Sequence, residues 1–336
     1  MLAEFLQLPP GEVRSRVPTD RRDADAVLDA GAFSFFLEWK SSGSAALVSG
    51  AIQQVSRFAA EADGNIVPVV VVPYMGEVGR KLCEEAGVAW MDLSGNAKIL
   101  APGLRILVDG QTNRFKQRGR PSSAFAPKSS RIARWLLMHP AQAMNQRHVA
   151  RATDMDEGFT SRIVAKLVDD GLVVRDPDGA IRPRDPDLLL DAWSEDYDFS
   201  KHEILRGHVA ARSGEELLQR LAEQLRARGV DYAATGLAAA WRLTRFASFR
   251  LATLYLQKEP ATSLLEEMSF RDDPRGANVW LVVPNDEGVF QGASTQHGIR
   301  CVHPVQIYLD LQQHPERAQE AAEHLRAQLL KWETDG

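Results

Sequence analysis

Three residues near the N-terminus have the types and spacing of a metal-dependent hydrolytic site. Glu38 and Lys40 flank Trp39 in the run FSFFLEWK, and Asp25 lies on the strand predicted before it. Residues two apart on a strand project from the same face, so Glu38 and Lys40 are expected together while Trp39 packs behind them. Two carboxylates, Asp25 and Glu38, holding Mg²⁺ or Mn²⁺ beside a lysine would polarise a phosphodiester and position a water molecule.

The elements predicted around these residues alternate between strands and helices. Strands are expected at residues 24–28, 33–39 and 66–72, and a helix at about 45–62. A further helix, a short strand ending at Met91 and a polar turn at residues 92–96 follow, and we interpret that turn as structural. This order predicts an α/β domain with a mixed sheet over residues 1–110.

This domain resembles the PD-(D/E)XK, or restriction-endonuclease-like, fold. The resemblance implies catalysis by Asp25, Glu38 and Lys40, with Asp25 and Glu38 as metal ligands. The sequence departs from that family's pattern, because no proline precedes Asp25 and little room remains upstream for a first helix. The same residues also fit a scaffold that has lost cleavage, so both interpretations stay open.

A second group of polar residues lies between positions 129 and 184. The runs SSRIARWLLMHP, NQRHVARAT and DEGFTSRIVAKLVDDG predict three helices, and LVVRDPDGAIRPR predicts two short strands hinged at Asp178-Gly179. Three helices followed by a hairpin are typical of a winged helix-turn-helix, whose third helix reads DNA. Apolar residues at helical spacing give this third helix a buried face, namely Phe159, Ile163, Val164, Leu167 and Val168. The residues expected to face outward are Thr160, Ser161, Arg162 and Lys166, and the hairpin, or wing, adds Arg175, Arg182 and Arg184.

The charge distribution points to the same region. The formal net charge is −5, yet no Asp or Glu occurs between Gln111 and Thr153. That segment holds Arg114, Lys116, Arg118, Arg120, Lys128, Arg131, Arg134, Arg147 and Arg151. A basic zone that leads into a helix-turn-helix favours phosphate binding over a merely solvated linker. We therefore expect residues 111–128 to be a basic linker, with Arg114, Lys116, Arg118, Arg120, Lys128 and Arg131 as DNA contacts. Trp135 is interpreted as core and His148 as an ordinary surface histidine.

Composition places the chain among globular proteins of several domains. It has 336 residues, with 44% hydrophobic and 25% charged content. No apolar run approaches the roughly 18 residues that span a bilayer, and the N-terminus lacks the pattern of a secretory signal. Cys83 and Cys301 are isolated, which suits a reducing cytoplasm and excludes a cysteine-clustered zinc site.

The last third predicts another α/β unit. EELLQRLAEQLRARG is an amphipathic helix, VDYAATGLAAAWRL reads as strand, turn and helix, and LATLYLQ and NVWLVVPND read as strands. The runs YAATGLAAAW, LATLYL and CVHPVQIYLDLQQHPERAQEAAEHLR resemble AbiEi-type antitoxin regulators of type IV toxin–antitoxin systems. The resemblance runs from Ser129 to the end. It implies a DNA-binding winged helix and a nucleotidyltransferase-like C-terminal fold.

Nucleotidyl transfer itself is not expected. That chemistry needs a Gly-Ser turn and two alternating acids on the next strand, whereas this chain has Thr235-Gly236 and no acid in LATLYLQ. Asp272 and Asp273 are adjacent, in a predicted loop. His297, Cys301 and His303 lack a fourth ligand and are not interpreted as a metal site.

The sequence thus predicts three domains: residues 1–110, 129–193 as the winged helix, and 194–336, with residues 111–128 between the first two. The favoured function is a cytoplasmic transcriptional regulator that binds double-stranded DNA, with a homodimer as one option. A metal-dependent endonuclease using Asp25, Glu38 and Lys40 is the alternative from a different class. A third possibility is an antitoxin that neutralises a toxin or defence protein through its C-terminal domain.

Overall fold

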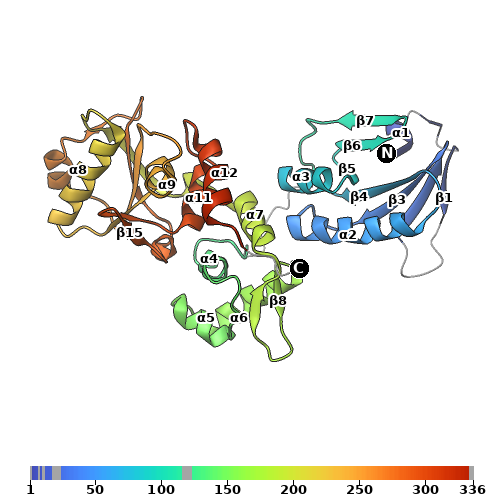
Figure 1. Ribbon diagram of the computed structural model, residues 1–336, viewed down its shortest axis with the longest axis horizontal. Coiled ribbons are helices and arrows are strands. Elements are labelled where there is room, and N and C mark those ends of the chain that lie inside the picture. The colour runs from blue at the N-terminus through green and yellow to red at the C-terminus, as the bar shows by residue number, and fades with distance from the viewer. Residues whose placement is uncertain (1, 7, 10–11, 17–23, 116–122, 333–336) are drawn as a thin grey trace. The chain divides into compact units, whose positions relative to one another are not determined.

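A computed structural model describes residues 2–6, 8–9, 12–16, 24–115 and 123–332. The chain folds as two compact units (Figure 1), one formed by residues 1–121 with 170–172 and the other by residues 122–169 and 173–336. The predicted basic linker, residues 111–128, spans the boundary between them. Its central cations, Lys116, Arg118 and Arg120, lie outside the described residues.

The N-terminal unit is built on a seven-stranded mixed sheet whose strands are neighbours in sequence order. The strands are β1 (Val13–Arg16), β2 (Ala26–Ala30), β3 (Phe33–Trp39), β4 (Ile66–Val72), β5 (Ala89–Asp92), β6 (Ala97–Ala101) and β7 (Leu104–Val108). The β3–β4 and β4–β5 pairs are parallel, and the other pairs are antiparallel. Parallel neighbours require crossovers, which α2 (Ala45–Glu61) and α3 (Glu77–Glu85) provide. The strands predicted at 33–39 and 66–72 coincide with β3 and β4.

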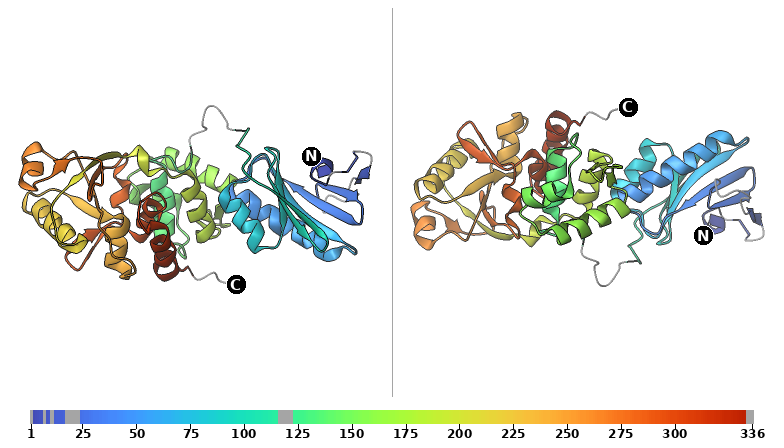
Figure 2. Two further views of the ribbon diagram at one scale, coloured as in Figure 1. Left: turned by 90° about the horizontal axis from the view of Figure 1, so that it is seen from above. Right: turned by 90° about the horizontal axis from the view of Figure 1, so that it is seen from below.

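The central strand β4 is apolar along its whole length and packs into a hydrophobic core on each face of the sheet. Val70 and Val72 pack with α2, which contributes Val48 and Val55, and Figures 1 and 2 show α2 and α3 on that side of the sheet. Val67, Val69 and Val71 face the opposite way, into a second cluster that includes Leu2 of α1 (Leu2–Phe5). Side chains alternate along a strand, so one run of valines serves two cores.

The second unit begins with the predicted winged helix. Its helices are α4 (Ser130–Met138), α5 (Gln146–Ala152) and α6 (Glu157–Asp169), followed by strands β8 (Val173–Arg175) and β9 (Ile181–Pro183). The strands pair antiparallel, and Met144 adds a bridge to Ile181. Asn145 caps α5 by accepting a hydrogen bond from the Arg147 N–H at 2.8 Å. α7 (Pro186–Asp196) leads onward, started by Asp185 as N-cap and Pro186 at the first turn.

The rest of this unit is a seven-stranded mixed sheet with helices, in the strand order β13-β10-β14-β12-β11-β16-β15. Its strands are β10 (Glu203–His208), β11 (Tyr232–Thr235), β12 (Ala252–Leu256), β13 (Arg271–Asp272), β14 (Val279–Val283), β15 (Ser294–Gln296) and β16 (Ile299–Cys301). Its helices are α8 (Gly214–Ala227), α9 (Gly236–Thr244), α10 (Thr262–Glu267), α11 (Pro304–Leu311) and α12 (Ala318–Leu329), with 3-10 turns η2 (Phe199–Lys201) and η3 (Glu287–Phe290). Asp272, predicted in a loop, instead pairs with Gly207 in the short strand β13.

Candidate nucleic-acid interface

The third helix of the winged helix presents a short polar surface. Ser161 and Arg162 are exposed and Lys166 is half-buried, while Ile163, Val164 and Leu167 form the buried side of α6. Arg162 lies over the Phe159 ring, with 5.6 Å from its Cζ to the ring centroid. Side chains four apart share a helical face, so Arg162 and Lys166 can reach one groove together.

Thr160 corrects the sequence-based assignment of this surface. We expected it to face outward, but its relative exposure is 0%. The reason is helical geometry: Thr160, Val164 and Leu167 are spaced by four and three residues and therefore share the inward stripe. Thr160 belongs to the core, and the outward set reduces to Ser161, Arg162 and Lys166.

The wing contributes three exposed arginines, Arg175, Arg182 and Arg184. Its turn is closed by the Gly179 N–H donating to the Asp176 carbonyl at 2.8 Å, and Gly179 takes a positive φ of 86°. Arg182 Nε lies 3.6 Å from Asp176 Oδ1, so an acid on the same hairpin partly neutralises it. The Asp-Gly hairpin was predicted at this position.

Arg131 on α4 is the second correction. Its relative exposure is 7%, and its guanidinium donates from Nε and Nη2 to the two carboxylate oxygens of Asp286 at 2.7 and 2.8 Å. Hydrogen bonding to Asp286 raises the pKa of Arg131 further, while burial opposes that shift. Arg131 therefore joins α4 to the C-terminal part of the same unit and is not available to DNA.

Arg134, one helical turn further along α4, is 2% exposed and donates from Nη2 to Gln306 Oε1 at 2.5 Å. Burial lowers its pKa to about 10. Gln306 Nε2 in turn donates to Asp310 Oδ1 at 2.7 Å. Gln306 thus links a buried cation on the winged helix to a buried carboxylate on α11.

Asp310 is the centre of a hydroxyl network that the sequence analysis missed. Its carboxylate accepts hydrogen bonds from the hydroxyls of Tyr197, Tyr255 and Thr235. Burial raises the pKa of Asp310 to about 6, against the opposing effect of these donors. A signal was present in PVQIYLDL, where the polar residues Gln306 and Asp310 lie four apart in an otherwise apolar helix.

The structure also locates Trp135, His148 and two of the predicted linker contacts. Trp135 is half-buried and donates from Nε1 to the Met144 sulfur at 3.2 Å, which agrees with a packing role. His148 is exposed. Of the predicted linker contacts that are described, Arg114 and Lys128 are both exposed.

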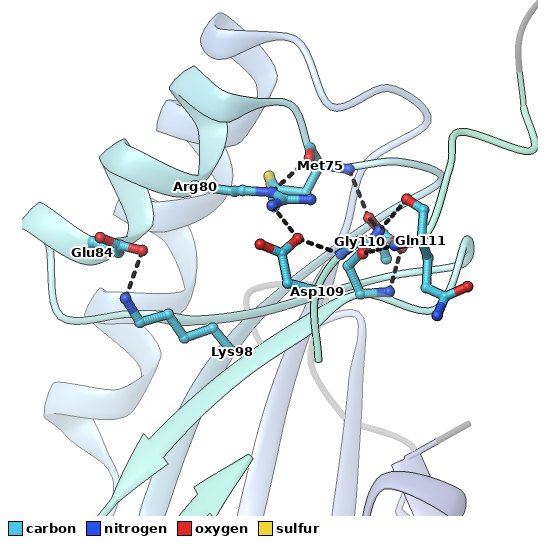
Figure 3. Close-up of polar contacts among 9 residues, drawn as sticks. Met75, Arg80, Glu84, Lys98, Asp109, Gly110 and Gln111 are labelled. Atoms are coloured by element: carbon cyan, nitrogen blue, oxygen red, sulfur yellow. Dashed lines mark hydrogen bonds and ion pairs between the residues drawn. The ribbon is translucent and has the colours of Figure 1, made fainter. Parts of the chain in front are cut away.

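The polar turn at residues 92–96 anchors the chain segment that leaves the N-terminal sheet. Asp92 is buried and accepts from the N–H of Met75 at 3.1 Å and from both the backbone N–H and the side-chain amide of Asn96 at 2.9 Å. Asn96 then exchanges hydrogen bonds with the backbone of Gln111 (Figure 3). Nearby, Arg80 bridges the Met75 carbonyl and Asp109. The turn is structural, as the sequence suggested, and it fixes the start of the basic segment.

The three nuclease-like residues lie at one end of the β2–β3 hairpin. Asp25 is exposed and accepts a hydrogen bond from the Trp39 N–H at 2.8 Å. Glu38 is only 3% exposed and pairs with Lys40 at 2.7 Å, while Lys40 Nζ also donates to Gln54 Oε1 at 2.7 Å. Trp39 is 41% exposed, so the expectation that it packs behind this pair was wrong. Trp39 is the last residue of β3.

No group of three or more His, Cys, Asp or Glu side chains is arranged to hold a metal ion within the described ranges. His297, Cys301 and His303, which are all described, therefore do not belong to such a group. The described Cys83 and Cys301 are buried free thiols, and burial raises the pKa of each to about 12.

Comparison with known families decides the class of the second unit. Residues 126–180 match the model of the MarR family, and residues 182–331 match AbiEi_2, described as a transcriptional regulator, AbiEi antitoxin, of a type IV toxin–antitoxin system. The AbiEi-type resemblance is confirmed. With it, the predicted function as a DNA-binding regulator or antitoxin with a winged helix is confirmed. A comparison with curated proteins gives no match. None of the helices in the described part of the chain is both long and apolar enough to cross a membrane.

Proposed function

We propose that this AbiEi-type regulator reads duplex DNA by placing α6 in the major groove while its wing contacts the phosphate backbone. The supporting observation is the exposed set Ser161, Arg162 and Lys166, which lies on the third helix of a segment that matches the MarR family. Arginine and lysine on a reading helix donate to guanine edges or phosphates, and serine suits either.

Backbone contacts are assigned to exposed cations outside α6. Arg175, Arg182 and Arg184 come from the wing, and Arg114 and Lys128 flank the segment that carries Lys116, Arg118 and Arg120. Phosphate contacts fix the register of a protein on DNA and carry the salt dependence of binding. Arg131 is left out of this set because Asp286 occupies its guanidinium.

The experiment is selection of bound duplexes from a random library, followed by titration of the enriched sequence between 50 and 200 mM KCl. If five phosphates are contacted, the slope of log K against log salt is about −4 to −5. Failure of the full-length protein to bind any duplex at 50 mM KCl would overturn the proposal.

We further propose the division into a restriction-endonuclease-like domain at residues 1–110, a winged helix at 129–193 and a nucleotidyltransferase-like domain at 194–336. In this scheme the outer two domains serve as scaffolds or partner surfaces. A toxin, a defence protein or a second copy of the chain would bind there. Co-purification of the protein with the product of a neighbouring gene, and its mass in solution, test the two kinds of partner.

Endonuclease activity is a second candidate, favoured by one observation. The Glu38–Lys40 pair and Gln54 form a part-buried polar cluster at the end of β3, where Asp25 accepts a hydrogen bond from the Trp39 N–H. Supercoiled plasmid is incubated with the protein and Mg²⁺ or Mn²⁺, beside the variant Lys40→Ala. Cleavage by the wild type alone supports catalysis at this site; equal cleavage by both proteins, or none, discards it.

A further inference from the structure

Arg175 differs from the other wing arginines in how its guanidinium is held. It is exposed at the end of β8, beside the first residue of α5, Gln146. With its oxygen toward Arg175, the Gln146 amide accepts a hydrogen bond from Nη1 at 2.8 Å and another from Nη2. The opposite amide orientation would set N–H donors against N–H donors, so the hydrogen-bond network assigns the oxygen to this side. Arg175 Nη1 also donates to the Gly179 carbonyl at 3.4 Å.

Counting donors shows which edge of the guanidinium remains available. Arginine has five N–H bonds, and these contacts use both on Nη1 and one on Nη2. The N–H on Nε and the second one on Nη2 have no partner within the described residues. These two bonds are parallel and form the side edge of the fork, the geometry that matches two oxygens of a carboxylate or phosphate.

The same protein uses this edge elsewhere. Arg131 binds the two oxygens of Asp286 through Nε and Nη2, at 2.7 and 2.8 Å. In Arg131 an acid of the protein occupies the edge, whereas no residue of the described chain binds that edge of the exposed Arg175. Arg175 is therefore arranged like Arg131 but without the internal anion.

The chemistry of the supporting partners matters as much as their number. Gln146 and the Gly179 carbonyl are neutral, so they orient Arg175 without cancelling its charge. Arg182 is oriented by Asp176 instead, at 3.6 Å, which offsets its charge. A neutral support that fixes a side chain in advance also removes part of the ordering cost of binding.

We propose that Gln146 is a positioning residue that presents Arg175 to the DNA backbone, where its Nε–H and Nη2–H take two oxygens of one phosphodiester. This inference rests on the proposed function and assigns one phosphate contact within it. Because the contact is to phosphate, it is independent of DNA sequence.

The test is a double-mutant cycle on the full-length protein, measured by fluorescence anisotropy with a random-sequence 30-bp duplex between 50 and 200 mM KCl. Arg175→Ala is expected to weaken binding about tenfold and to reduce the salt slope by about one. Gln146→Ala is expected to weaken binding by about threefold to tenfold in the wild type, and to have no effect when Arg175 is already alanine.

Gln146→Glu separates positioning from general structural support. Glutamate keeps the acceptor in place but supplies a negative charge, so the salt slope should fall by about one, as for Arg175→Ala. The exposed Gln142→Ala variant is the matched control and should bind as the wild type does. Thermal unfolding of each variant checks that it is folded.

The outcomes separate the two levels of the proposal. No binding by the wild type removes the proposed function and this contact together. If the wild type binds, an effect of Gln146→Ala that is equal in both Arg175 backgrounds, or absent from both, overturns the positioning role alone. An unchanged salt slope in Gln146→Glu has the same consequence.

Discussion

The winged helix carries two sets of arginines with opposite surroundings. On α4, Arg131 and Arg134 are buried and bind Asp286 and Gln306 from the C-terminal part of the unit. On α6 and the wing, Arg162, Arg175 and Arg184 are exposed. The residue type is the same in both places, although the stretch without acids includes α4 and ends before α6. The difference teaches that packing divides the arginines of one winged helix into residues that bind the rest of the unit and residues that stay exposed.

The largest expected effect concerns the buried side. Replacing Asp310 with alanine leaves the hydroxyls of Tyr197, Tyr255 and Thr235 and the Gln306 amide without their acceptor. We expect the free energy of unfolding to fall by about 3–5 kcal/mol, measured by denaturant titration. Asp310→Asn keeps one oxygen acceptor and should lose less. A Asp310→Ala protein as stable as the wild type would show that this network does not hold the unit together.

Acidification should weaken the same interior. Burial lowers the pKa of His202, His303 and His314 from 6.5 to about 4, so each is neutral in the folded protein. Below about pH 6.5 these histidines bind protons more tightly in the unfolded chain than in the folded protein. Their contribution to the free energy of unfolding is therefore complete above pH 6.5 and is lost as the pH falls toward 4. Asp310 has the opposite effect. Burial raises its pKa to about 6, so the folded protein binds a proton there more tightly than the unfolded chain does, and protonation of Asp310 stabilises the fold as the pH falls. Three histidines outweigh one carboxyl, and we expect a net loss of roughly 2–4 kcal/mol between pH 7 and pH 5.

His303→Asn provides the control for this pH dependence. His303 caps α11 by accepting from the Val305 N–H at 3.2 Å, and asparagine is a good N-cap that does not titrate. Unfolding of this variant should depend less on pH than unfolding of the wild type. Parallel pH profiles for the two proteins would remove His303 from the explanation.

On the exposed side, the variant Arg162→Ala/Lys166→Ala should bind the selected duplex about tenfold to a hundredfold more weakly. Its free energy of unfolding should stay within about 0.5 kcal/mol of the wild type, because neither side chain is part of the core. Arg250→Ala/Lys258→Ala, two exposed cations of the C-terminal part, is the matched control. Unchanged affinity after the first double substitution would end the assignment of α6 as the reader.

The smallest effect is expected for Arg131→Ala, which tests the boundary between the two sets directly. Loss of its paired hydrogen bonds to Asp286 should lower the free energy of unfolding by about 1–2 kcal/mol. The salt slope of DNA binding should not change, measured where the variant is fully folded. A slope reduced by about one would restore Arg131 to the DNA surface, as the sequence suggested.

The structural features that could be predicted from the sequence are those that local residue patterns determine. The valines of β4, the apolar stripe of α6 and the Asp178-Gly179 hairpin each specify a conformation within a few residues. The exposure of Ser161 and Arg162, the proposed reader residues, follows directly from that stripe. Thr160 was misassigned because the buried face of α6 includes this polar residue as well as the apolar residues from which the face was predicted.

What the sequence by itself determined is the order of elements and the class of each segment, since periodicity, turn residues and charge act over short distances. Only the tertiary structure decided that Arg131 and Arg134 are buried against partners, because those partners, Asp286 and Gln306, lie 155 and 172 residues away in the sequence. It also brought Tyr197, Thr235 and Tyr255 around Asp310. Whether a charged side chain faces solvent or a partner depends on which distant groups folding places beside it, and the neighbouring sequence carries no record of that.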